Sequence, residues 1–95
     1  MYKFSLSVRA YHTARRYGLP RWELWRALPA ETMRAACLEA AHAVLAHGRG
    51  KKTAAELYRA AGLGVYEIAR ITGLELDTVR RDCGRFDQRL HESLT

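Results

Sequence analysis

Residues 65–81 of this chain, VYEIARITGLELDTVRR, decide its fold. Apolar residues recur at helical spacing on both sides of Gly73, which predicts two short amphipathic helices joined by a tight turn. Gly73 suits the end of the first helix because glycine adopts a positive φ without strain. Ala69 is small at the point where the two helices have to cross at close range. The apolar residues expected to hold the second helix at its angle are Ile68, Leu74 and Val79.

Helical patterning continues on both sides of this stretch. Thr53 and Glu56 have the spacing of a capping box, in which the threonine hydroxyl accepts a backbone N–H and the glutamate reaches back to the cap. A helix is therefore predicted from Thr53 to Gly62. On the other side, one apolar stripe predicts a last helix that runs almost to the end of the chain. Its members are Leu76, Val79, Cys83, Phe86, Leu90 and Leu94.

The first half of the chain has helical patterning as well. Its clearest helix is predicted over residues 30–47 and ends at Gly48. The apolar stripe of that helix consists of Met33, Cys37, Ala40 and Val44. Further elements are expected at residues 7–17 (a helix capped by Ser5 or Ser7), 20–28 (a helix with Pro20 in its first turn) and 1–6 (a strand or an arm).

The pattern formed by Ile68-Ala69, Gly73-Leu74 and Thr78-Val79-Arg80-Arg81 resembles the bacterial helix-turn-helix families. Over residues 53–86 the chain is similar to the DeoR-type repressors, whose recognition helix shares the run from Thr78 to Asp82, and to the last domain of sigma factors. The resemblance implies a small sequence-specific DNA-binding protein, a transcriptional regulator that contacts DNA through its last helix.

The fold expected from patterning and resemblance together is all-α. We predict one small helical domain of about five helices, with a trihelical helix-turn-helix in the carboxy-terminal half. Residues 51–95 form the helix-turn-helix region. Residues 1–50 form a helical region that packs against it or mediates dimerisation.

The expected DNA contacts lie on the outward face of the last helix and at the start of the first motif helix. Arginine can bind guanine through two parallel hydrogen bonds, and a helix start suits phosphate. Gly84 would allow the backbone to approach DNA closely. The predicted DNA-binding residues are Lys51, Lys52, Asp77, Thr78, Arg80, Arg81, Gly84 and Arg85. The alternative for the helix face is a solvated surface on which Asp77 and Arg81 form an i,i+4 pair.

The net charge of +6 and the isoelectric point near 9.8 favour an anionic partner such as nucleic acid. Residues 1–30 hold six basic residues against one acidic residue, whereas residues 75–95 hold four arginines against five acids. Six of the nine aromatic residues also lie in the first thirty positions, including Trp22 and Trp25, which are expected in the core. Additional contacts are therefore predicted at Arg9, Arg15, Arg16 and Arg21.

Three features depart from the helix-turn-helix families. Glu75 stands where a serine or threonine cap is usual, the chain continues as a helix rather than a two-stranded wing, and the last helix is not basic. The alternative is a protein-interaction module, an adaptor or inhibitor encoded by a phage or other mobile element, that uses the same fold on a protein partner. An RNA-binding protein is a third hypothesis.

A homodimer is expected because one recognition helix reads few bases. The candidate surfaces are the helix at 30–47 and the tail residues Phe86, Leu90 and Leu94.

No enzyme, metal or cofactor is predicted. Cys37 and Cys83 are far apart and lie on apolar helix faces, so both are expected to be reduced core thiols. The four histidines lack zinc-ligand spacing, and no catalytic triad or glycine-rich nucleotide loop is present. No apolar run approaches the ~18 residues of a membrane span, and the first residues lack a signal pattern. The expected location is the cytoplasm.

Overall fold

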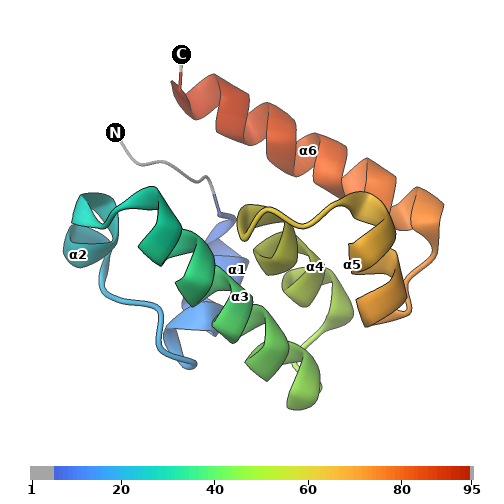
Figure 1. The fold of residues 1–95 in the computed structure, drawn as a ribbon, viewed down its shortest axis with the longest axis horizontal. Coiled ribbons are helices and arrows are strands. Elements are labelled where there is room, and N and C mark those ends of the chain that lie inside the picture. Colours follow the sequence, from blue (N-terminus) through green and yellow to red (C-terminus); the bar gives the residue numbers. More distant parts are fainter. Residues whose placement is uncertain (1–5, 95) are drawn as a thin grey trace.

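The computed structural model describes residues 6–94, except for the side chains of Trp22, Arg26 and residues 89–94, and these residues form six α-helices (Figure 1). Their bounds are α1 Val8–Arg15, α2 Trp22–Ala27, α3 Ala30–Ala46, α4 Lys51–Ala60, α5 Val65–Thr72 and α6 Leu76–Leu94. No strand occurs between residues 6 and 94, so the all-α prediction is confirmed. The strand or arm expected at residues 1–6 lies outside the described part except for Leu6.

The centre of the fold is the packing of α3 on α4, with α1 lying against both. The predicted stripe of α3 is confirmed, since Met33, Cys37, Ala40 and Val44 are fully buried. α4 buries three alanines, Ala54, Ala55 and Ala60, together with Leu57 and Tyr58. The largest fully buried side chains are Trp25, Tyr58, Leu19 and Met33, so the expected core position of Trp25 is confirmed. One core therefore joins the two halves of the chain.

The last three helices pack against one another in pairs, which gives the trihelical arrangement expected for the second half. Gly73 has φ 76° and ends α5 in the left-handed conformation, as its place in the sequence predicts. Ile68 and Val79 are fully buried, and Leu74 is partly buried against the core. In Figure 1, α6 runs along the top of the molecule, above α4.

The capping box predicted at Thr53 and Glu56 is wrong. α4 begins two residues earlier, at Lys51, because Gly50 has φ 114° and serves as the residue before the helix. Thr53 therefore lies inside the first turn. Glu56 turns away from the helix start and binds Ser7, whose backbone N–H donates to Glu56 Oε2 at 2.7 Å and whose hydroxyl donates to Oε1 at 3.1 Å.

The amino-terminal helix is capped by Ser7, one of the two residues expected to do so. The Ser7 hydroxyl oxygen accepts the Ala10 N–H at 3.1 Å. Ser5 lies outside the described residues. In the last helix, Val79, Cys83 and Phe86 are buried as their stripe predicts, while the side chains of Leu90 and Leu94 lie outside the described part. Among residues 6–94, no helix combines the length and the apolar character needed to cross a membrane.

Candidate nucleic-acid interface

The turn between α5 and α6 is three residues long and is held by side-chain hydrogen bonds. The buried Thr72 hydroxyl donates to the Ile68 carbonyl at 2.7 Å and accepts the Leu74 N–H at 3.3 Å. Lys51, the first residue of α4, places its Nζ 3.9 Å from the point where a Cβ on Gly73 would lie. The start of α4 therefore lies beside the turn, and Lys51 belongs to the same surface as the start of α6.

Arg80 is held in place by residues on both of the motif helices. Its Nη2 donates to the Tyr66 hydroxyl at 2.8 Å, and its guanidinium lies 5.5 Å from the centre of the Tyr66 ring. On the other side, Nη1 lies 3.9 Å from Asp77 Oδ1. An arginine braced in this way loses less side-chain entropy when it binds a second partner.

Two expectations change at this point. The pair predicted between Asp77 and Arg81 is wrong, because Asp77 lies near Arg80 at i,i+3 instead. Tyr66 was not among the predicted site residues, although it is 67% exposed and contacts one of them. The available signal was an aromatic residue on the polar face of α5, opposite the stripe that contains Ile68.

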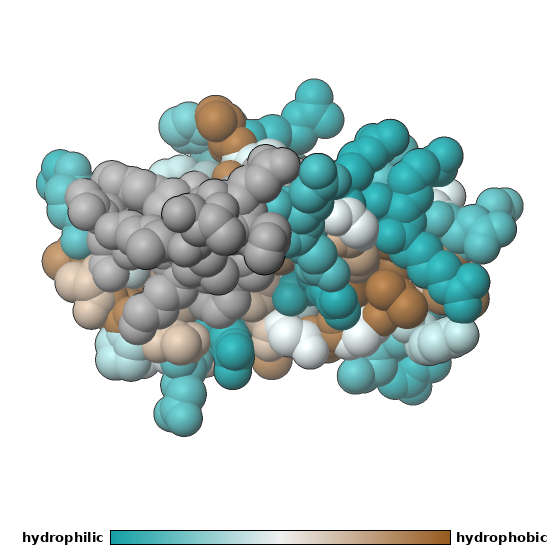
Figure 2. Space-filling model, turned by 90° about the horizontal axis from the view of Figure 1, so that it is seen from above, coloured by the Kyte–Doolittle hydropathy of each residue, from teal (hydrophilic) through white to brown (hydrophobic). Residues whose placement is uncertain are grey.

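The outward face of α6 carries most of the residues predicted to contact DNA. Asp77, Arg80, Arg81, Gly84 and Arg85 are exposed, and Thr78 is half-buried. A Cβ added to Gly84 would meet no heavy atom within 4 Å, so the surface above this glycine is open. Figure 2 looks down on this side of the molecule and shows hydrophilic side chains to the right of the grey part, with hydrophobic ones between and below them.

The acidic residues of α6 are not spread evenly around the helix. Its near-zero net charge therefore does not describe the charge of each face. Asp87 faces α4, where Arg59 binds it through Nε at 3.1 Å and Nη2 at 2.7 Å. These hydrogen bonds are the main cause of the raised pKa of Arg59. One acid of the helix is thus neutralised by a cation from another helix. Among the described residues of α6, the exposed charged side chains are Asp77, Arg80, Arg81 and Arg85, and Arg85 lies at the edge of the outward face beside the cavity.

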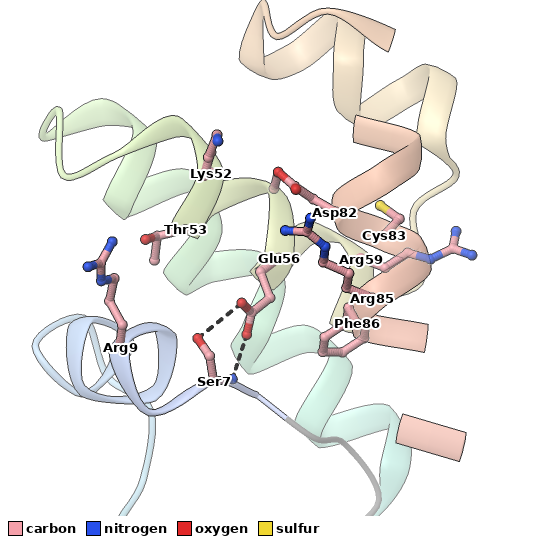
Figure 3. Close-up of a pocket in the computed structure, with 11 residues that line it drawn as sticks. Ser7, Arg9, Lys52, Thr53, Glu56, Arg59, Asp82, Cys83, Arg85 and Phe86 are labelled. Carbon is pink, nitrogen blue, oxygen red and sulfur yellow. Dashed lines mark hydrogen bonds between the residues drawn. The ribbon is translucent and has the colours of Figure 1, made fainter. Parts of the chain in front are cut away.

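A cavity of about 370 Å³ lies between α1, α4 and α6, and Arg85, at the edge of the outward face of α6, is one of its lining residues. Figure 3 shows the Ser7–Glu56 hydrogen bonds that join α1 to α4, with Arg9 on the α1 side and Arg85 on the α6 side. Lys52 also lines this cavity. Two predicted residues of the motif and one arginine of the amino-terminal segment are therefore brought to one place.

The other three arginines of the amino-terminal segment have different environments. Arg15 donates through Nη1 to the Leu19 carbonyl at 2.7 Å, which fixes the loop after α1. Arg21 lies 3.7 Å from Glu23, and both side chains are about three-quarters exposed. Arg16 is exposed at the end of α1. Unlike Arg9, none of these three lines the cavity beside α6.

The cysteines are both free and buried, as expected for core thiols. Burial raises the pKa of Cys37 to about 12 and also raises the pKa of Cys83. Within the described residues, no three side chains of the His, Cys, Asp or Glu type gather where they could hold a metal ion.

Comparisons of the chain with models of protein families, with curated proteins and with solved structures found no match.

Proposed function

We propose that the protein is a sequence-specific DNA-binding regulator that contacts double-stranded DNA through the outward face of α6. The observation that supports this most strongly is the position of Arg80. A guanidinium held between Tyr66 and Asp77 at the start of an exposed helix is prepared to present its remaining donors to a base edge.

The proposed contacts divide into base contacts and phosphate contacts. α6 enters the major groove, where Arg80 and Arg81 face the bases and Gly84 lets the helix backbone come close. Thr78 and Arg85 lie at the edges of the same face and bind phosphate oxygens. Lys51 and Lys52 bind phosphate beside the turn. The Asp87 carboxylate does not oppose DNA in this arrangement, because Arg59 already binds it.

We also propose that the protein binds DNA as a homodimer, since two recognition helices double the number of bases that are read. The apolar stripe of α3 is not available for this purpose because it is buried against the rest of the chain. Phe86 is likewise buried. The remaining candidate for the dimer surface is therefore the tail of α6 beyond residue 88.

Selection from a random pool of duplexes tests sequence-specific binding. The unmodified protein is expected to enrich a motif that contains guanine. An Arg80→Ala/Arg81→Ala variant is expected to lose the enrichment, because each bidentate arginine–guanine contact contributes about 1–3 kcal/mol of discrimination. An Arg16→Ala/Arg34→Ala variant is the control, since it removes the same charge from exposed positions on α1 and α3.

Other results would point to the alternatives. Enrichment that persists in the α6 variant but disappears in the control variant would move the base contacts to the amino-terminal arginines. Absence of duplex binding by the unmodified protein would contradict the proposal and favour a protein partner. Preferential binding of single-stranded RNA would favour the third hypothesis.

A further inference from the structure

The cavity between α1, α4 and α6 is lined by two charged residues, Glu56 and Arg59, that are hydrogen-bonded within the protein. The Glu56 carboxylate accepts the Ser7 N–H and the Ser7 hydroxyl, at 2.7 and 3.1 Å. The Arg59 guanidinium binds Asp87 and donates through Nη1 to the Leu63 carbonyl at 3.0 Å. These two residues therefore hold the three helices together, and their charges are engaged within the protein.

Three basic residues that line the same cavity differ from Glu56 and Arg59 in this respect. Arg9, Lys52 and Arg85 are exposed, and none of their side chains has a hydrogen bond or ion pair with another described residue. They come from three different helices and line one cavity (Figure 3). Like charges repel, so three cations around one opening destabilise the fold slightly unless an anion is present. Two acids line the same cavity, Glu56 on α4 and Asp82 on α6, and both are half-buried.

The geometry points to a binding site for a phosphate group, held by Arg9, Lys52 and Arg85. Arginine and lysine provide the charged donors that phosphate oxygens prefer, and the exposed part of the cavity leaves an entry from solvent. A volume of about 370 Å³ is near the lower end of the range of ligand sites, so the cavity admits a phosphate together with part of the group that carries it. That group is a small phosphate ester or the backbone of DNA bound at α6.

Titration with two probes at constant ionic strength distinguishes these sources. One probe is adenosine monophosphate, a small ester, and the other is a random duplex. Binding is followed by amide chemical shifts in the full chain. The site predicts that at least one probe shifts the signals of residues 7–9 and 52–56, and that Arg9→Ala weakens its binding about tenfold. Arg34→Ala, which removes one positive charge from an exposed position on α3, is the matched control and is expected to leave binding unchanged.

The Asp82→Asn variant is expected to bind the probe more tightly, whereas Arg9→Ala is expected to bind it more weakly. Removing this carboxylate leaves Glu56, which is hydrogen-bonded to Ser7, as the remaining acid of the cavity, so binding of the same probe should become severalfold tighter. A response to adenosine monophosphate identifies a free ester as the ligand, and a response to the duplex alone identifies the DNA backbone.

The site is overturned if neither probe shifts these signals, or if Arg9→Ala and Arg34→Ala have equal effects on both probes. The assignment of the DNA backbone as the ligand rests on the proposed function. The phosphate site and the proposed function can nevertheless fail separately. Duplex binding that needs Arg80 and Arg81 but not Arg9, without an ester response, rejects only the phosphate site. Ester binding by a protein that does not bind duplex rejects only the DNA proposal.

Discussion

Ser7 connects two helices through three hydrogen bonds. It caps α1 by accepting the Ala10 N–H, and it donates its own N–H and hydroxyl to Glu56 of α4. Replacement of Ser7 by alanine removes the cap and one bond to Glu56, so we expect a loss of about 1–2 kcal/mol in the free energy of unfolding. Urea denaturation measures it.

Thr53→Ala is the informative control for this prediction. Thr53 lies inside α4 and does not cap it, so its replacement should cost less than about 0.5 kcal/mol. A larger loss at Thr53 than at Ser7 would restore the capping box and contradict the structure.

Burial of the Cys37 thiol makes stability depend on pH in the alkaline range. The unfolded thiol loses its proton near the ordinary pKa of 9.0, whereas the folded thiol keeps its proton up to a pKa of about 12. The unfolded state therefore binds fewer protons above pH 9, and stability falls as pH rises, by up to about 1.4 kcal/mol per pH unit.

Denaturation at a series of pH values up to about 10 tests this effect of Cys37. A Cys37→Ala variant should be less stable throughout but should lose less stability as pH rises. Some dependence remains in the variant, because burial also raises the pKa of Cys83. Identical pH profiles for the two proteins would show that Cys37 ionises in the folded state as freely as in the unfolded state.

The contacts of single residues were the hardest feature to predict from the sequence. Glu56 has ideal spacing for a local cap, yet it binds Ser7, which is 49 positions away. Arg80 binds Tyr66 and Arg59 binds Asp87, each across a helix crossing. Periodicity assigns a residue to a face of its own helix, but the partner depends on the angle and distance at which the next helix packs.

At the scale of the elements, the two glycines of the motif have opposite roles. Gly73 ends α5 with φ 76°, a conformation that costs other residues about 1–2 kcal/mol. Gly84 lies within α6 in open space, where alanine is the better helix former by about 0.5–1 kcal/mol. We therefore expect Gly73→Ala to lower the melting temperature and Gly84→Ala to raise it, as calorimetry would measure. A rise for Gly73→Ala would be incompatible with the turn described here.

Helix positions were largely predictable because periodicity and glycine act locally. The pattern around Gly73 placed α5 and the start of α6, and the stripe beginning at Met33 placed α3 and its buried face. The start of α4 was missed by two residues. The cause is again local, since Gly50 adopts a positive φ that lets the helix begin at Lys51, whereas the capping signal at Thr53, three residues after Gly50, predicted a later start.

At the scale of the whole molecule, the distribution of charge could not be predicted from the net charges of segments. The last helix is close to neutral in the sequence, which weakened the case for DNA. In the fold, Arg59 neutralises Asp87, and Asp82 lies at the cavity rather than on the outward face. The candidate site residues at the motif could therefore be named from the sequence. That Arg9 lies at the same cavity as Lys52 and Arg85 could not be predicted, because it depends on how α1 packs on α4.

The salt dependence of duplex binding tests the central claim most directly. Each phosphate neutralised by a lysine or arginine contributes about 0.9 to the slope of log K against log salt, so several contacts give a steep decline. We expect the unmodified protein to bind a random duplex at low salt with a slope of about −3 or steeper, and the Arg80→Ala/Arg81→Ala variant to bind much more weakly. Absence of binding at low salt, or equal binding by the variant, would contradict DNA recognition by α6.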